Sequence, residues 1–249
     1  MDLTINVNKL YDAFLTLLYP QSCVICERSV ERRALGVACE ECWRSTVIFT
    51  GDEMLCWKCG APFVGSVDKS KRREVRCHRC DGYAFSVVRA CGLYENALRE
   101  TILNLKRQPH IPQTAARLLL NTALREPLNE STSIVPVPLH PKRLQMRGFN
   151  QASVIARTLS SSLRLPINEV SLIRTSHTEK YRAGLDAKGR SDSVARAFEV
   201  VHPRLVAREK ILLLDDVFTT GATAAMCSRV LIEAGAAAVN VLTIARTAR

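Results

Sequence analysis

One stretch decides the fold of this chain: Ile211-Leu-Leu-Leu-Asp-Asp-Val-Phe-Thr-Thr-Gly-Ala-Thr223. Its first four residues are apolar, which is typical of a buried strand in a parallel sheet. Two acids follow, and the hydroxyl residues and the glycine after them lead into a helix predicted over 221–234. Open α/β sheets bind ligands at the carboxyl ends of their strands. The stretch therefore predicts a strand, a binding turn and a helix within an α/β domain.

This turn has the chemistry to hold a phosphorylated ribose. The backbone amides of residues 219–223 lie near the predicted helix N-terminus, where the helix dipole favours an anion, and the glycine lets the backbone approach closely. The two acids would repel a phosphate at contact, but their carboxylates can accept hydrogen bonds from ribose hydroxyls. An ordinary strand–turn–helix with a capping threonine would not require the whole string. The predicted sugar-phosphate contacts are Asp215, Asp216, Thr219, Thr220, Gly221, Ala222 and Thr223.

The regions before and after this stretch alternate between strand and helix patterns. A strand or hairpin is predicted over 87–94, strands over 133–137, 211–214 and 239–245, and helices over 95–106, 115–124, 150–163 and 221–234. Such alternation predicts a parallel sheet with right-handed crossovers. Because the composition changes after Gly82, we predict an N-terminal module over 1–84 and an α/β domain over 85–249.

The N-terminal module is dominated by cysteine. Eight of the ten cysteines form four Cys-x-x-Cys pairs, separated by 12, 13 and 17 residues. Two residues between cysteines let one tight turn aim both sulfurs at a single ion about 2.3 Å away. Four such pairs predict two structural zinc sites of four thiolates each, which would stabilise a segment too poor in aliphatic residues to bury a core. The predicted ligands are Cys23, Cys26, Cys39, Cys42, Cys56, Cys59, Cys77 and Cys80.

The order in which these pairs combine is left open by their spacing. Sequential pairing is the simplest arrangement, an interleaved pairing is the alternative, and His78 within the last pair is an alternative ligand. The two remaining cysteines, Cys91 and Cys227, are predicted to be buried small hydrophobic residues.

The composition favours a cytoplasmic protein with an anionic partner. Asp2, Lys9 and Asp12 interrupt any signal-peptide core, and no stretch approaches the roughly 20 apolar residues of a membrane span. Clustered thiols without an export signal indicate a reducing compartment. The formal net charge is +11, and it stays positive when eight thiolates and two zinc ions are counted. A nucleic acid, nucleotide or phosphate partner is therefore favoured over a role in solubility alone. Residues 8–19 predict an amphipathic helix that packs on its own protein; docking to a partner or a membrane surface is the alternative.

Further segments match a known family. The Asp-Asp-x-x-Thr-Thr-Gly-x-Thr string resembles the phosphoribosyl pyrophosphate motif of type I phosphoribosyltransferases. Together with the cysteine pairs, residues 20–247 resemble the ComF family of competence-associated proteins, which includes GntX-like DNA-utilisation proteins. That family has an N-terminal double zinc ribbon followed by a type I phosphoribosyltransferase domain. The other matching segments are Lys106, Val135-Pro-Val-Pro-Leu139, Arg143, Arg147-Gly-Phe-Asn-Gln151 and Ala245-Arg-Thr247.

The resemblance implies that phosphoribosyl pyrophosphate binds together with Mg²⁺. It also implies a loop that closes over the ligand and excludes water. We take residues 176–193 as this loop, with Arg182 or Arg190 closing over the ligand. The chain departs from the family at Arg182 and Ser193, where the family pattern has Gln and Asn, so we assign no catalytic residue. The further ligand contacts that the resemblance implies are a pyrophosphate-binding turn at Val137, Pro138, Leu139 and His140, and the cations Lys106, Lys142, Arg143 and Arg147.

As a function, the resemblance implies a cytoplasmic competence factor that helps to take up or process single-stranded DNA in natural transformation or DNA utilisation. Other DNA-uptake or recombination proteins would be its partners. The alternatives are an active phosphoribosyltransferase of nucleotide salvage and a non-catalytic sensor of phosphoribosyl pyrophosphate. The residues that we expect to contact DNA are Lys71, Arg72, Arg73, Arg76, Arg79, Trp43, Trp57 and Phe63.

Overall fold

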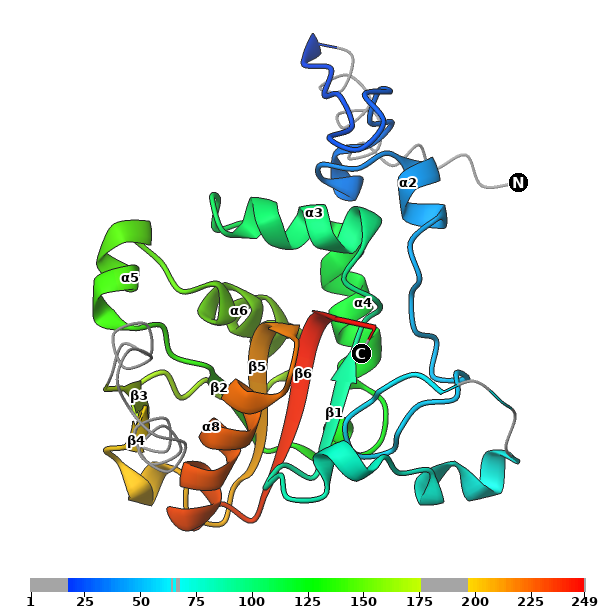
Figure 1. The fold of residues 1–249 in the computed structure, drawn as a ribbon. Coiled ribbons are helices and arrows are strands. Elements are labelled where there is room, and N and C mark those ends of the chain that lie inside the picture. Colours follow the sequence, from blue (N-terminus) through cyan, green and yellow to red (C-terminus); the bar gives the residue numbers. More distant parts are fainter. Residues whose placement is uncertain (1–17, 64, 66–67, 176–196, 249) are drawn as a thin grey trace, which may run out of the picture.

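The computed structural model describes residues 18–63, 65, 68–175 and 197–248. At its centre lies a four-stranded sheet with the strand order β1-β6-β5-β2, in which all neighbours are parallel (Figure 1). A separate antiparallel pair, β3 and β4, lies beside it. The strands are β1 (Val87–Ala90), β2 (Ser133–Pro136), β3 (Leu172–Arg174), β4 (Phe198–Val200), β5 (Lys210–Phe218) and β6 (Ala238–Arg246).

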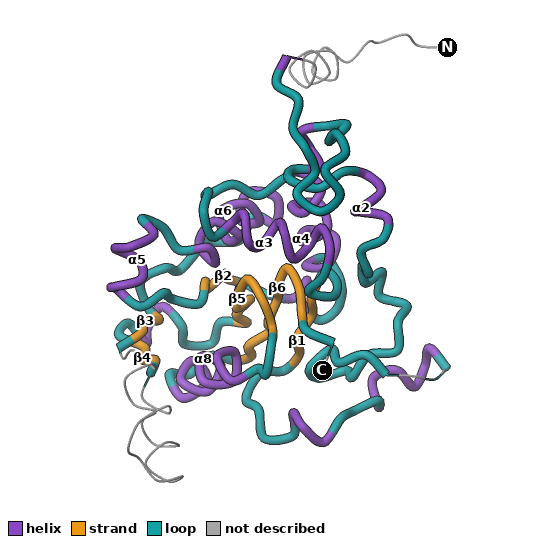
Figure 2. Tube along the Cα trace, turned by 45° about the horizontal axis from the view of Figure 1, so that its top comes forward, coloured by secondary structure: helices purple, strands orange, loops and turns teal. Residues whose placement is uncertain are grey.

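Helices cover both faces of the central sheet. Figure 2 shows α3, α4 and α6 on one side of the strands and α8 on the other. The helices are α2 (Glu40–Arg44), α3 (Asn96–Leu105), α4 (Gln113–Ala123), α5 (Pro141–Arg147), α6 (Gln151–Leu163) and α8 (Ala222–Glu233). Short 3₁₀ helices are η1 (Arg33–Leu35), η2 (Lys69–Glu74), η3 (His78–Cys80), η4 (Leu128–Glu130) and η5 (Pro203–Leu205).

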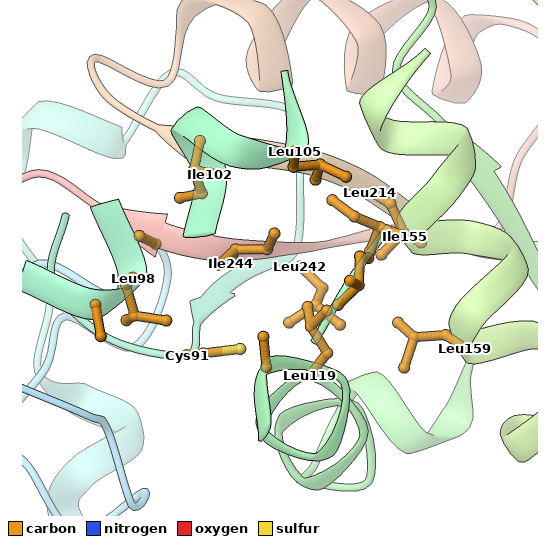
Figure 3. Packing of buried hydrophobic residues seen from close by; sticks show 14 of the residues in the cluster. Cys91, Leu98, Ile102, Leu105, Leu119, Ile155, Leu159, Leu214, Leu242 and Ile244 are labelled. Atoms are coloured by element: carbon orange, nitrogen blue, oxygen red, sulfur yellow. The ribbon is translucent and has the colours of Figure 1, made fainter. Parts of the chain in front are cut away.

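Alternation of side chains along β5 divides the core in two. Leu212 and Leu214 belong to the apolar cluster formed with α3, α4 and α6, whereas Ile211 and Leu213 belong to the cluster formed with α8. Burial of each such side chain contributes about 1.5–3 kcal/mol. Figure 3 shows the first cluster, in which the sheet residues Leu214, Leu242 and Ile244 face Leu98, Ile102, Leu105, Leu119, Ile155 and Leu159 of the helices.

The two cysteine-rich segments contact opposite faces of this core. The first, residues 18–45, includes α2 and lies above α3, where it is drawn in blue in Figure 1. Its Cys23, Cys39 and Cys42 pack with the α3–α4–α6 cluster. The second segment runs beside β1 to residue 84, and its cysteines pack with the α8 cluster. We use "first ribbon" for 18–45 and "second ribbon" for 54–84.

Most predicted elements are confirmed, and the prediction of a parallel sheet flanked by helices is confirmed with them. The strand predicted over 211–214 is shorter than the observed β5, whose pairing with β6 continues to Phe218. The β3–β4 pair and the helices α2 and α5 were missed. The helix predicted over 8–19 lies almost wholly outside the described residues, and the loop at 176–193 lies entirely outside them. The domain boundary near residue 85 stays a prediction.

Among the helices that the structure describes, none has the length and apolar character needed to span a bilayer.

Candidate functional site

Each ribbon brings four cysteine sulfurs together as the spacing predicts. The clusters are Cys23, Cys26, Cys39 and Cys42, and Cys56, Cys59, Cys77 and Cys80; within each cluster all sulfurs lie within 4.8 Å of one another. The sulfur–sulfur separations of 3.4–3.7 Å are close to the edge of about 3.8 Å that a tetrahedral zinc–thiolate site requires. These two Cys₄ sites fit structural zinc.

The clusters also settle the pairing order. Cysteines combine sequentially, so the interleaved alternative is wrong for the arrangement seen here. His78 is fully exposed and lies near Asp81, 3.8 Å between Nδ1 and Oδ2, so it replaces none of the sulfurs. Cys91 and Cys227 are completely buried away from both clusters, in agreement with the prediction.

The candidate ligand cavity opens where β5 extends beyond the end of β2. The last β2–β5 partners are Pro136 and Leu214, whereas β5 stays paired with β6 as far as Phe218. The chain after β2 turns away over 137–139, with the Val137 amide donating to the Leu214 carbonyl at 2.9 Å. A cavity of about 380 Å³ lies at this edge. Ten predicted contacts line it: Lys106, Val137, Pro138, Leu139, Arg143, Arg147, Asp215, Asp216, Thr219 and Thr223.

The two acids lie within the strand, because β5 is longer than predicted. Adjacent strand residues point to opposite faces, so the acids meet different partners. Asp216 Oδ2 lies 4.0 Å from the Lys106 Nζ at the end of α3. Burial and the neighbouring charge of Asp216 raise the pKa of Asp215 to about 8, and the charge of Arg174 opposes this shift. The Asp215 carboxyl can thus lose its proton when a ligand supplies hydrogen-bond donors to it.

The predicted phosphate turn has the backbone that the sequence requires. Gly221 precedes α8 with a φ of 83°, and a Cβ there would lie 2.6 Å from the Phe218 ring. Only glycine therefore fits this left-handed position. The first amides of α8 have no partner within the helix, as at every helix N-terminus. Thr219 and Thr223 line the cavity, whereas Thr220, Gly221 and Ala222 belong to the turn but do not line it.

The opposite wall is built by the turn after β2 and by α5. The His140 side chain accepts a hydrogen bond from the Lys142 amide and so caps the start of α5. The helix ends at Gly148, whose φ is 78°. Arg143 and Arg147 thereby reach the cavity, and Lys142 is exposed outside it. Asn150 donates to the Val137 carbonyl at 3.0 Å, which ties the two matching segments together.

Other lining residues were not assigned from the sequence. Arg174 comes from the end of β3, and Tyr94, Gln151 and Thr247 come from three further parts of the chain. Gln151 is 4% exposed, and its Nε2 has no hydrogen-bond partner among the described residues, so it is available to a ligand oxygen. Gln151 and Thr247 lie inside segments that match the family, and this was the signal that could have assigned them. Arg174 and Tyr94 carried no such signal.

The residues expected to contact DNA are not equally available. Trp43 is buried, and its Nε1 donates to the Leu35 carbonyl, so it cannot stack on a base. Trp57 lies against the guanidinium groups of Arg73 and Arg89 at 5.3 and 4.6 Å. Phe63 is 40% exposed. Two of the five cations are engaged: Arg72 with Asp52 and Arg73 with Glu126; Lys71, Arg76 and Arg79 are exposed.

Comparison with solved structures finds phosphoribosyltransferases. The chain matches the glutamine phosphoribosylpyrophosphate amidotransferase of B. subtilis with a TM-score of 0.38 and 20% identity, over 55% of this chain and 29% of that one. It matches the orotate phosphoribosyltransferase of Aeropyrum pernix with a TM-score of 0.31 and 19% identity, over 54% of this chain and 60% of that one.

Comparison of sequences identifies relatives along nearly the whole chain. The double zinc ribbon domain family matches residues 14–81. The DNA utilization protein YhgH of Escherichia coli is 30% identical over 239 residues, which cover 93% of this chain and 99% of that protein. Competence protein F of Haemophilus influenzae is 35% identical over 55% of this chain and 61% of its own length. Competence protein ComFC of Bacillus subtilis is 26% identical over 82% of this chain and 89% of its own length. The chain therefore belongs to the ComF family of competence and DNA-utilisation proteins.

Proposed function

We propose that this protein binds phosphoribosyl pyrophosphate in the cavity at the end of β5 and assists the handling of single-stranded DNA. The observation that carries the first part is the composition of that cavity. The lining combines two carboxyls with residues at the start of a helix and with the cations Lys106, Arg143 and Arg147. Carboxyls suit sugar hydroxyls, and a helix N-terminus and arginines suit phosphates. A ligand with a ribose between two phosphate groups satisfies all three.

In this proposal each wall of the cavity binds a different part of the ligand. The amides of 219–223 and the hydroxyls of Thr219 and Thr223 receive the 5′-phosphate, while Asp215 and Asp216 accept from the ribose hydroxyls. The turn at 137–139 and the arginines of α5 receive the diphosphate. Mg²⁺ prefers oxygen ligands, so Asp215 and Asp216 would hold it together with the bound ligand, and it would neutralise part of their charge.

Calorimetric titration with phosphoribosyl pyrophosphate and Mg²⁺ tests this site. Wild-type protein should bind with micromolar affinity, and the double variant Asp215→Ala/Asp216→Ala should lose at least 100-fold. The double variant Glu130→Ala/Glu169→Ala, which removes two acids outside the cavity, is the control for charge and should bind like wild type. Equal affinity for wild type and the Asp variant would contradict the site.

The DNA part is supported by the relatives' names and by the basic surface of the second ribbon. Lys71, Arg76 and Arg79 are exposed cations there, and phosphate contacts of this kind make binding steeply dependent on salt. Mobility shifts of a single-stranded oligonucleotide at increasing salt should show that dependence. Neutralising these three residues should weaken binding about tenfold or more. The control variant Arg117→Ala/Arg204→Ala/Arg208→Ala removes the same charge elsewhere; an equal loss in both variants would argue against this surface.

Whether the protein also transfers the phosphoribosyl group is measured separately. Diphosphate release upon addition of purine and pyrimidine bases would identify an active phosphoribosyltransferase. Binding of phosphoribosyl pyrophosphate without release with any acceptor would favour the sensor.

A further inference from the structure

A cleft lined by cations lies at the amino end of the sheet. Its volume is about 470 Å³, and it is bounded by the second ribbon, by residues 85–87 at the start of β1 and by the turn 126–130 that follows α4. Val87 pairs with Asn240 at the start of β6, whereas Thr247, which lines the cavity at the end of β5, follows the end of β6. About 20 Å of extended chain therefore separates the two sites along β6.

The walls of this cleft are fixed by hydrogen bonds to the sheet. The Val88 amide of β1 donates to the Lys58 carbonyl of the second ribbon at 2.7 Å. On the other side Asn240, which is buried in β6, donates to the Pro127 carbonyl at 3.1 Å. The ribbon and the turn 126–130 are thus both attached to neighbouring strands, so the cleft is formed before a ligand binds.

The lining of the cleft is positive once its ion pairs are counted. It contains three cations and two acids: Lys58, Arg73, Arg76, Glu126 and Glu130. Arg73 pairs with Glu126, and Lys210, which lies outside the cleft, pairs with Glu130 at 2.8 Å. Among the described residues no carboxylate pairs with Lys58 or Arg76, and the Lys58 Nζ donates only to the Asp81 carbonyl at 3.4 Å. Two cations are therefore available to an anion.

Trp57 belongs to the same lining and holds cations in place. Its ring lies against the guanidinium groups of Arg73 and Arg89, and such cation–π contacts orient an arginine. The Arg89 guanidinium also donates to the Trp57 carbonyl at 2.7 Å. Ser86 adds an exposed hydroxyl to the lining. Lysine, arginine and serine side chains are contacts for phosphate, so the cleft suits a sugar-phosphate backbone rather than a base.

We propose that this cleft binds the phosphate backbone of single-stranded DNA, independently of the ligand at the end of β5. The inference rests on the DNA part of the proposed function and names the surface that performs it. A flexible single strand can place its phosphodiesters in a concave site, whereas the phosphates of a duplex lie on a broad convex cylinder. Because the contacts are to phosphate, they carry no base preference. The strand and phosphoribosyl pyrophosphate can then be bound at the same time.

Fluorescence anisotropy of a labelled single strand at increasing salt tests the cleft. The double variant Lys58→Gln/Arg76→Gln removes both unpaired charges and should weaken binding about tenfold at low salt. Each phosphate contact of a single strand contributes about 0.7 to the slope of log K against log salt, so the slope should fall by about 1.4. A purely structural effect would leave that slope unchanged. Full zinc content and wild-type affinity for phosphoribosyl pyrophosphate show that the variant is folded.

The matched control is Arg204→Gln/Arg208→Gln, which removes two exposed arginines outside the cleft. It should leave both the affinity and the salt slope as in wild type. An affinity and slope that are unchanged in Lys58→Gln/Arg76→Gln, or lowered equally in the control, would remove the cleft while the protein still binds DNA. A duplex of the same length that binds as tightly as the single strand would overturn the choice of a single strand.

A competition titration tests the independence of the two sites. Saturation with phosphoribosyl pyrophosphate and Mg²⁺ should leave the affinity for the strand within about threefold. Displacement of the strand would place DNA in the cavity at the end of β5 and overturn the proposal. If wild-type protein binds no strand at low salt, the DNA part of the proposed function fails together with the cleft; the calorimetric titration of phosphoribosyl pyrophosphate then decides the other part by itself.

Discussion

The two ribbons have the same four-cysteine chemistry but different neighbours. The cysteines of the first pack on the sheet face covered by α3, α4 and α6, and none of the described residues of this ribbon lines a cavity beside the phosphate turn. The cysteines of the second pack on the other face, and three of them line a larger cavity, of about 1190 Å³, beside that turn. Loss of zinc from the second ribbon should therefore disturb the surroundings of the phosphate turn, whereas loss from the first should not.

A matched pair of ligand variants provides the strongest test of this difference. Cys26 and Cys77 are both partly buried, and a structural zinc site contributes on the order of 10 kcal/mol. Each change to Ser should lower the zinc content from two ions to one per chain. Cys77→Ser should weaken the binding of phosphoribosyl pyrophosphate, because Cys77 lines the cavity beside the phosphate turn, and Cys26→Ser should leave it within about threefold. Metal analysis and calorimetry measure both effects; equal loss in the two variants would remove the distinction.

Each ribbon also has an arginine that hydrogen-bonds to its cysteine segment, and the burial of these two arginines differs. Arg246 is buried against the second ribbon, whereas Arg28 is exposed, and its hydrogen bond to Cys26 lowers the pKa of that thiol. Arg246→Met should cost roughly 1–3 kcal/mol, because the buried Cys59 carbonyl loses its donor. Arg28→Met should cost clearly less. Urea unfolding of zinc-loaded protein measures both, and a larger effect at Arg28 would reverse the comparison.

Ligand affinity and stability should also depend on pH through Asp215, which lies on the sheet face covered by the second ribbon. Asp215 is protonated below about pH 8 in the empty protein, whereas ribose hydroxyls favour its carboxylate. Affinity for phosphoribosyl pyrophosphate should thus rise with pH up to about 8 and then level off, about tenfold per unit below that point. The same raised pKa makes the unliganded protein lose stability as pH rises from about 4, where an unfolded Asp ionises, to about 8. Asp215→Asn should abolish the slope; a slope that persists in this variant would assign it to another group.

The smallest expected effect concerns the tryptophan of the first ribbon. Trp43→Phe removes the hydrogen bond from Nε1 to the Leu35 carbonyl and should lower the free energy of unfolding by about 1 kcal/mol. Binding of phosphoribosyl pyrophosphate should not change, because Trp43 lines neither cavity beside the phosphate turn. A drop in that affinity would show that the first ribbon is coupled to the site.

Local chemistry explains which features could be predicted from sequence. The β5–turn–α8 unit is contiguous, and the cysteine pairs carry their ligand geometry within four residues each. The place of Arg174 in the cavity could not be predicted, since Arg174 belongs to the short β3–β4 pair, whose sequence pattern is weak. Nor could the larger cavity, because the Tyr83–Thr220 contact that borders it spans 137 positions. The separate partners of Asp215 and Asp216 could not be predicted, because β5 continues four residues past Leu214, where the predicted strand ends.

The most direct test of the central claim is a crystal structure of zinc-loaded protein with phosphoribosyl pyrophosphate and Mg²⁺. The account predicts the 5′-phosphate on the amides of 219–223, the ribose at Asp215 and Asp216, and the diphosphate toward Arg143 and Arg147. A saturated crystal in which that cavity stays empty, or in which the ligand lies elsewhere, would contradict it.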